Sequence, residues 1–214
     1  DIVTGSTHKT FFGTQRGIAA TGFTPQEPRY ELWEAIQRRT FPGSLSNHHL
    51  GTLLGLLMAA YEMNHFKGEY QPRVIANAKA FACALKECGL AVAGDPAVAY
   101  TETHQVIVKV GYAKGAEMAR RLEENNIILN YQAAPDEEGF TAAGALRLGV
   151  QEMTRFGMET GDFAELAQLM ADCILRDQPV REKVSQLRRR FLDMRYCFVG
   201  DDMDMLIQQL HQAI

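Results

Sequence analysis

Apolar residues along the first half of the chain follow a helical period. Apolar residues recur at intervals of three and four from residue 50 to residue 61, which predicts a buried helix that starts near Ser46. A second helix is predicted over residues 69–88, where Gly89 supplies the terminating residue. The apolar stripes of these two helices are Leu50, Leu53, Leu54, Leu57, Met58 and Tyr61, and then Val74, Ala78, Phe81 and Leu85.

The middle of the chain changes to a mixed pattern. Val106, Val108 and Val110 alternate with other residues, which predicts a half-buried strand. The other expected elements are strands over 127–129 and 145–150 and helices over 113–124, 151–157 and 160–176. Alternation of strands and helices indicates a small α/β domain over residues 92–178, and the pattern beyond it is helical again.

The first 23 residues read as a strand, a loop and a second strand. Residues 1–4 have the pattern of a strand already in progress, so we expect the sequence to begin inside a larger fold. The loop Gly5–Thr10 is rich in small and hydroxyl residues and contains Lys9. A lysine amine in such a loop can attack an aldehyde when its pKa is lowered by partial desolvation. An ordinary exposed lysine would give the same pattern, so this loop alone leaves both interpretations open.

Composition excludes several classes of protein. Of the 214 residues, 46% are hydrophobic and 22% are charged, which is typical of a globular protein. The net charge of −4 argues against a nucleic-acid-binding surface, and no apolar run is long enough to cross a bilayer. The four cysteines form no CxxC pair, which favours a reducing, cytoplasmic location. We therefore expect neither nucleic acid nor a membrane as a partner.

Several motifs resemble one enzyme family when they are taken in order. Thr7–Thr10, with Gly13 after it, resembles the Thr-His-Lys-Thr segment of serine hydroxymethyltransferases, in which the lysine carries pyridoxal 5′-phosphate (PLP). The resemblance extends over about residues 1–176, which is much more specific than any single motif. The other matching segments are Phe41-Pro42-Gly43, Asn77-Ala78-Lys79-Ala80, Thr101-Glu102-Thr103-His104, Ala145-Leu146-Arg147-Leu148-Gly149 and Thr154-Arg155-Phe156-Gly157-Met158.

This resemblance implies an α/β fold with three parts. Residues 1–91 would form the end of a PLP fold-type-I large domain, which makes homodimers in such enzymes. Residues 92–178 would form the small α/β domain, and residues 179–214 a helical extension. The first half of the fold, which holds most phosphate contacts and the groups around the pyridine ring, would be missing. We therefore expect this chain alone to be inactive.

The resemblance also implies roles for individual residues. Lys9 would bind PLP as a Schiff base, and His8 would lie beside it near the cofactor. Ser6 and Thr7 would contribute hydroxyl groups to the phosphate or to the lysine. Arg147 would bind the α-carboxylate of a small amino-acid substrate through its two-pronged guanidinium. A surface arginine on an edge strand is the simpler interpretation of Arg147.

The segment before the predicted long helix has a second possible role. In the resembled family, a glycine-rich loop at this point reaches the cofactor phosphate of the neighbouring subunit. Here the loop contains Ser46 and Asn47. Their backbone N–H groups can still donate to a phosphate, and Ser46 adds a hydroxyl group, so we expect both residues to contact the phosphate. The adjacent His48 and His49 would point to different sides of a helix and lack a third ligand at suitable spacing, so we expect no metal site.

Departures from the family pattern affect the predicted reaction. The Gly-Pro-Arg after the lysine becomes Gly13-Thr14-Gln15-Arg16, which places the arginine one residue later. The family's Asn-Lys-Asn becomes Asn130-Tyr131-Gln132 in a region that contributes to the folate site, so tetrahydrofolate is possible but doubtful. We predict aldol-type chemistry at the Cα–Cβ bond of glycine, serine or threonine. Threonine aldolase or transaldolase activity, transamination and a non-catalytic fragment are the alternatives.

Overall fold

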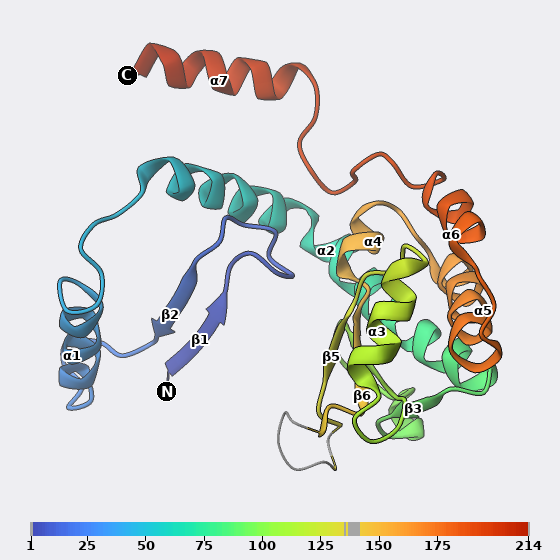
Figure 1. The fold of residues 1–214 in the computed structure, drawn as a ribbon. Helices are drawn as coiled ribbons and strands as arrows, with labels where there is room; N and C mark the ends of the chain where they lie inside the picture. The colour runs from blue at the N-terminus through green and yellow to red at the C-terminus, as the bar shows by residue number, and fades with distance from the viewer. Residues whose placement is uncertain (1, 135, 137–141, 214) are drawn as a thin grey trace. The chain divides into compact units, whose positions relative to one another are not determined.

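The computed structural model describes residues 2–134, 136 and 142–213, and the chain divides into two compact units. Unit 1 comprises residues 1–65 and unit 2 comprises residues 66–214. This division differs from the boundaries after residues 91 and 178 that the sequence suggested, which stay a prediction about the domains of the family fold. The described chain is a mixture of helices and strands, as expected (Figure 1).

Unit 1 contains a two-stranded antiparallel hairpin and two helical segments. Strand β1 (Ile2–Ser6) pairs with β2 (Gly17–Thr21), so that Ser6 lies opposite Gly17 and the lysine loop connects the two strands (Figure 1). Helix α1 (Tyr30–Thr40) follows, and α2 (Leu50–Glu87) begins in unit 1 and ends in unit 2. The hairpin confirms the predicted order of strand, loop and strand.

Helix α2 corrects two expectations. It runs without interruption for 38 residues and contains Pro72, where the sequence suggested two helices with a break between residues 61 and 69. Gly68 is the only strong helix breaker in that gap, and a single glycine costs a helix only about 1 kcal/mol. The helix also begins at Leu50 and not near Ser46. Its start was misplaced because residues 46–49 carry no apolar stripe that could mark the boundary.

The apolar run at the start of α2 is exposed, which contradicts the prediction of a buried helix. Leu50, Leu53 and Tyr61 expose 62%, 49% and 60% of their surfaces. Periodicity predicts that an apolar face exists but does not say what covers it. Among the described residues of this run, only Ala59 is buried.

Unit 2 is built on a four-stranded antiparallel sheet with the strand order β3-β4-β6-β5. Its elements are β3 (Ala91–Ala93), a 3-10 turn (Pro96–Val98), β4 (Gln105–Lys109), α3 (Gly115–Glu124), β5 (Asn130–Gln132), β6 (Ala145–Gly149), α4 (Gln151–Arg155), α5 (Thr160–Arg176), α6 (Arg181–Arg188) and α7 (Asp201–Ala213). Helix α3 packs against β5, β6 and α5, and α5 packs against α6 (Figure 1). The apolar stripe expected on α7 includes Met203, Leu206 and Leu210, whose side chains are not among those that the structure describes.

The core of unit 2 is formed where the apolar stripes meet. The predicted stripe of the later part of α2 is confirmed, since Phe81 and Leu85 expose 2% and 0% of their surfaces. The ring of Phe81 lies 5.3 Å from that of Phe163 on α5. From the sheet, Val106, Val108, Leu146 and Leu148 are buried, which fits alternation along β4 and β6. This core fixes the position of β6.

The strand expected at residues 127–129 lies three residues later in the structure. Asn126 adopts a φ of 64° just after α3, and the N–H group of Ile127 donates to the carbonyl oxygen of Leu122. This turn ends the helix and includes Ile127, one of the apolar residues of the predicted strand. Strand β5 therefore begins only at Asn130. Ile128 is 85% exposed as a result. Among the helices that the structure describes, we find none with the length and apolar character of a membrane span.

Candidate functional site

The loop that carries Lys9 is closed by hydrogen bonds across its base. The N–H group of Thr7 donates to the carbonyl oxygen of Arg16 at 3.0 Å, and that of Gly13 donates to the carbonyl oxygen of Thr7 at 2.6 Å. The hydroxyl group of Thr7 donates to the carbonyl oxygen of Thr14 at 2.7 Å. Because these bonds continue the pairing of β1 and β2, the hairpin holds the loop at a fixed point on its end.

Lys9 lies exposed on this loop. Its amine forms no hydrogen bond or ion pair with any residue that the structure describes, and the adjacent His8 and Ser6 are likewise exposed. The amine is therefore reachable by an aldehyde, although the described residues do not supply the partial desolvation that the sequence argument required. An unpaired amine next to free hydroxyl and imidazole groups fits the donor set that PLP requires.

Thr7 differs from its neighbours because it is buried. Its side chain exposes only 4% of its surface, and its hydroxyl proton is directed to carbonyl oxygens of Thr14 and Arg16. A donor that is engaged in this way stabilises the loop and is less free to bind a phosphate oxygen. The structure thus gives Thr7 a structural contact, while its cofactor role stays a prediction.

The lysine loop approaches the first turns of α2 closely. A Cβ atom added to Gly13 would lie 2.7 Å from the carbonyl oxygen of Thr7 and 2.7 Å from Cδ1 of Leu56. A Cβ atom on Gly55 would lie 2.8 Å from Cγ2 of Thr14. A side chain at either position would therefore force the neighbouring atoms to shift. The sequence did not predict that the lysine loop would approach α2 here.

Ser46 and Asn47 lie in the exposed segment before α2. The side-chain oxygen of Asn47 accepts a hydrogen bond of 2.8 Å from the N–H group of His48. Because the helix begins at Leu50, these residues precede its first turn and do not form it, and their phosphate role stays a prediction. Among the described residues, no group of three potential metal ligands comes together at His48, His49 or elsewhere.

Arg147 lies in the centre of β6 in unit 2. Its neighbours in register are Ile107 on β4 and Asn130 on β5, so it sits on a central strand. This placement excludes the interpretation of Arg147 as a residue of an edge strand. Since Leu146 and Leu148 point into the core, alternation directs the Arg147 side chain to the opposite face of the sheet.

The charge of Arg147 is not neutralised within the described chain. The side chain is half-buried, and no described residue forms an ion pair or a hydrogen bond with its guanidinium. By contrast, Lys109 on β4 binds Asp136 at 2.8 Å, and this hydrogen bond lowers the pKa of the exposed carboxyl group. A partly buried guanidinium without a counter-charge is suited to a carboxylate ligand.

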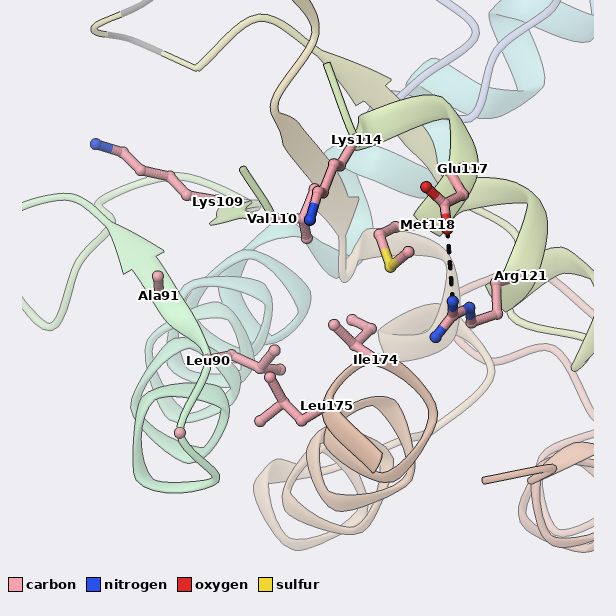
Figure 2. A pocket seen from close by; sticks show the side chains of 11 residues that line it. Leu90, Ala91, Lys109, Val110, Lys114, Glu117, Met118, Arg121, Ile174 and Leu175 are labelled. Atoms are coloured by element: carbon pink, nitrogen blue, oxygen red, sulfur yellow. Dashed lines mark ion pairs between the residues drawn. The ribbon is translucent and has the colours of Figure 1, made fainter. Parts of the chain in front are cut away.

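A hollow of about 410 Å³ lies elsewhere in unit 2, between β3, β4, α3 and α5 (Figure 2). Leu90, Met118 and Ile174 line its apolar part. Most of its charged groups are already paired, because Arg121 binds both Glu117 at 3.5 Å and Asp177 at 3.0 Å. The hollow therefore lacks the unpaired groups of the candidate site.

Comparisons with known proteins agree with the motifs. The family model of serine hydroxymethyltransferase matches residues 1–170. The serine hydroxymethyltransferase of Pyrobaculum aerophilum is 42% identical over 203 residues, which cover 94% of this chain and 46% of the relative. That of Archaeoglobus fulgidus is 42% identical over 204 residues, with coverage of 92% and 45%. The chain thus spans about half the length of these curated relatives.

A solved structure extends the agreement to the fold. The crystal structure of L-threonine transaldolase from Pseudomonas fluorescens, in its internal aldimine state, superimposes with a TM-score of 0.87. The identity is 30%, and the match covers 98% of this chain and 48% of the transaldolase chain. The ordered motifs, the lysine loop and the family model lead to the same conclusion: this chain belongs to the serine hydroxymethyltransferase family.

Proposed function

We propose that the protein acts as a PLP-dependent enzyme that forms or cleaves the Cα–Cβ bond of glycine, serine or threonine. The observation that carries this proposal is the unpaired, exposed amine of Lys9 on the Thr-His-Lys-Thr loop, in a chain of this family. Bound PLP would supply an electron sink for the negative charge that develops at Cα.

The residues of the lysine loop would bind the cofactor. The Nζ atom of Lys9 would hold PLP through the aldehyde of the cofactor, and the same nitrogen, when released, could take up or return a proton. His8 lies beside Lys9 and is exposed, so its imidazole is available near the cofactor. Hydroxyl groups from Ser6 and Thr7, together with Ser46 and Asn47, would bind the phosphate. Of these residues, Thr7 would contribute least to phosphate binding, because its hydroxyl group already donates to the carbonyl oxygen of Thr14.

Arg147 would bind the substrate carboxylate. Its guanidinium can form two parallel hydrogen bonds with a carboxylate, which fixes the orientation of the amino acid as well as its position. A fixed orientation keeps the scissile bond aligned for cleavage, which contributes to the rate through proximity. The central position of Arg147 on β6 supports this role, because a packed strand holds the start of the side chain rigidly.

The electrophile divides this proposal into two candidates. A one-carbon unit carried by tetrahydrofolate, to which Cα of glycine would add, is the first candidate, favoured by membership of the serine hydroxymethyltransferase family. An aldehyde to which Cα would add is the second candidate, favoured by the L-threonine transaldolase that matches 98% of the chain. The altered Asn130-Tyr131-Gln132 segment, which forms β5, also favours the aldehyde.

The proposal includes a homodimer and a cytoplasmic location. The exposed apolar face of α2, with Leu50, Leu53 and Tyr61, supports a subunit contact through the large domain. The net charge of −4 and the four free cysteines agree with a protein of the cytoplasm that binds no nucleic acid.

The decisive experiment traps the covalent bond between Lys9 and PLP. The protein, expressed from the longest reading frame that contains residues 1–214, is incubated with PLP and reduced with borohydride. Peptide mass analysis is expected to find the pyridoxyl group on Lys9, and Lys9→Ala is expected to abolish it. Lys183→Ala, at an exposed position on α6, is the control. Absence of the label from Lys9 in the unaltered protein would favour a non-catalytic role.

Product analysis then separates the reactions. Glycine with an aldehyde is compared with serine plus tetrahydrofolate, and each product is identified by mass. Formation of a β-hydroxy amino acid without folate would support the aldehyde as electrophile. Formation of a keto acid would instead identify transamination and contradict the proposed bond cleavage.

A further inference from the structure

A set of hydrogen bonds joins the lysine loop to the first turns of α2. The hydroxyl group of Thr14 donates to the carbonyl oxygen of Thr52 at 2.6 Å. The guanidinium of Arg16 donates to the carbonyl oxygen of His49 at 2.6 Å and also to the hydroxyl oxygen of Thr52. Thr52 completes the set, since its own hydroxyl group donates to the carbonyl oxygen of His49 at 2.9 Å. We call Thr14, Arg16 and Thr52 the clasp.

The clasp is connected to Lys9 through the base of the loop. The carbonyl oxygen of Arg16 accepts hydrogen bonds from the N–H group of Thr7 at 3.0 Å and from its hydroxyl group at 3.1 Å. The carbonyl oxygen of Thr14 accepts the other hydrogen bond of the Thr7 hydroxyl group. Both loop members of the clasp therefore hold Thr7, which precedes Lys9 by two residues. A displacement of the clasp would move the lysine.

The clasp also reaches the segment that contains Ser46 and Asn47. His49, which receives the hydrogen bonds of Arg16 and Thr52, lies two residues after Asn47 and directly before α2. The clasp thus ties together the two pieces of unit 1 that are proposed to bind the cofactor.

The clasp uses a position at which this chain departs from the family motif. Thr14 lies in the segment Gly13-Thr14-Gln15-Arg16, which is one residue longer before the arginine than the Gly-Pro-Arg of the motif. A proline could not donate the hydroxyl hydrogen bond that Thr14 donates to Thr52. Gly55 provides the space for the Thr14 methyl group, which lies 2.8 Å from where a Cβ atom would be.

We propose that Thr14, Arg16 and Thr52 are positioning residues that fix the Lys9 amine relative to the start of α2. This inference rests on the proposed function, because it assumes that Lys9 binds PLP. The clasp residues do not need to touch the cofactor: they restrict the conformations of the loop. A looser loop places Nζ at the productive position for a smaller fraction of the time, which weakens covalent binding by that fraction.

The test measures how tightly PLP binds covalently at Lys9 in matched valine variants. Thr52→Val removes the hydroxyl group that joins Arg16 to the helix, and Thr14→Val removes the donor on the loop. Thr40→Val is the control, because the Thr40 hydroxyl group donates only to Ile36 within α1. We expect the apparent Kd for PLP to rise about fivefold in each clasp variant, the typical effect of one hydrogen bond, and to stay within about twofold in the control.

A conservative variant separates positioning from a loss of folding. Thr52→Ser keeps the hydroxyl group and is expected to restore the Kd of the unaltered protein. If Thr52→Val also lowers the thermal midpoint, the serine variant decides, because a hydroxyl-dependent rescue of binding supports the clasp.

The outcomes keep this inference distinct from the proposed function. If the unaltered protein binds no PLP at Lys9, the proposed function fails and the clasp fails with it. If the unaltered protein binds PLP and both clasp variants behave like Thr40→Val, the proposed function stands and the clasp is overturned.

Discussion

The side-chain amide of Asn77 donates two hydrogen bonds of 2.9 Å, one to the hydroxyl oxygen of Thr154 and one to the carbonyl oxygen of Met158. The side chains of Asn77 and Thr154 are buried and expose only 3% and 1% of their surfaces. The Thr154 hydroxyl group in turn donates to the carbonyl oxygen of Val150, the residue that follows β6. The long helix is thereby joined to the end of the strand that carries Arg147.

We predict that Asn77→Ala lowers the free energy of unfolding by about 2–3 kcal/mol, because it leaves buried acceptors without their donor. Urea unfolding followed by circular dichroism measures the change. Gln186→Ala is the control: its amide bonds Glu182 at 3.3 Å on the exposed face of α6, and its effect should stay within about 0.5 kcal/mol. Equal effects for the two variants would contradict the structural role of Asn77.

Gly13→Ala is predicted to disturb the lysine loop. The added methyl group would lie 2.7 Å from a backbone oxygen of Thr7, which cannot move without opening the base of the loop. We expect less PLP to be trapped on Lys9 after borohydride reduction, by at least about fivefold. Gly51→Ala places a methyl group where no atom lies within 4 Å and should trap PLP as the unaltered protein does. Normal trapping in Gly13→Ala would refute the close packing at this glycine.

Arg147→Met is predicted to impair substrate binding more than cofactor binding. Loss of a bidentate guanidinium–carboxylate contact costs about 3 kcal/mol, so kcat/KM for the amino acid should fall at least about a hundredfold. Steady-state kinetics and PLP trapping at Lys9 are measured on the same preparations. Arg120→Met removes an exposed cation paired with Glu124 at 2.6 Å on α3 and should leave both quantities unchanged. A drop in PLP trapping with unchanged kcat/KM would exclude the carboxylate role.

The stability of unit 2 is predicted to fall at alkaline pH because of Tyr70. Burial raises the pKa of the Tyr70 hydroxyl group far above its ordinary value of 10.0, with Arg155 opposing this rise and Tyr196 adding to it. Above about pH 10 the unfolded chain has lost this proton while the folded chain keeps it, so the free energy of unfolding decreases as the pH rises.

Tyr70→Phe tests this pH dependence. At neutral pH the variant loses the hydrogen bond of 3.0 Å to the carbonyl oxygen of Gln151, and we expect it to be less stable by about 1 kcal/mol. Its disadvantage should shrink as the pH rises above about 10, because phenylalanine has no proton to lose. Urea unfolding at several pH values measures both effects. Tyr112→Phe is the control, because Tyr112 is 76% exposed. A constant difference at all pH values would exclude the buried hydroxyl as its cause.

The elements that depend on a local pattern of residues could be predicted from the amino-acid sequence. Alternation at Val106 and Val108 predicted β4, and the spacing of Val74, Phe81 and Leu85 predicted the buried stripe of α2. The ordered set of motifs over about residues 1–176 indicated the family. These features can be predicted because period and chemical type are properties of neighbouring residues.

The segments that each of these patterns contacts could be known only from the folded chain. The leucines at the start of α2 have the same period as its buried half, yet they are exposed, since burial depends on which other segment packs there. The roles of Arg16 and Thr52 likewise could not be predicted, because 35 intervening residues separate partners that meet only when the loop folds onto the helix. Hydrogen bonds between distant segments leave no periodic trace in the sequence, so the contacts that hold Lys9 in place appear only in three dimensions.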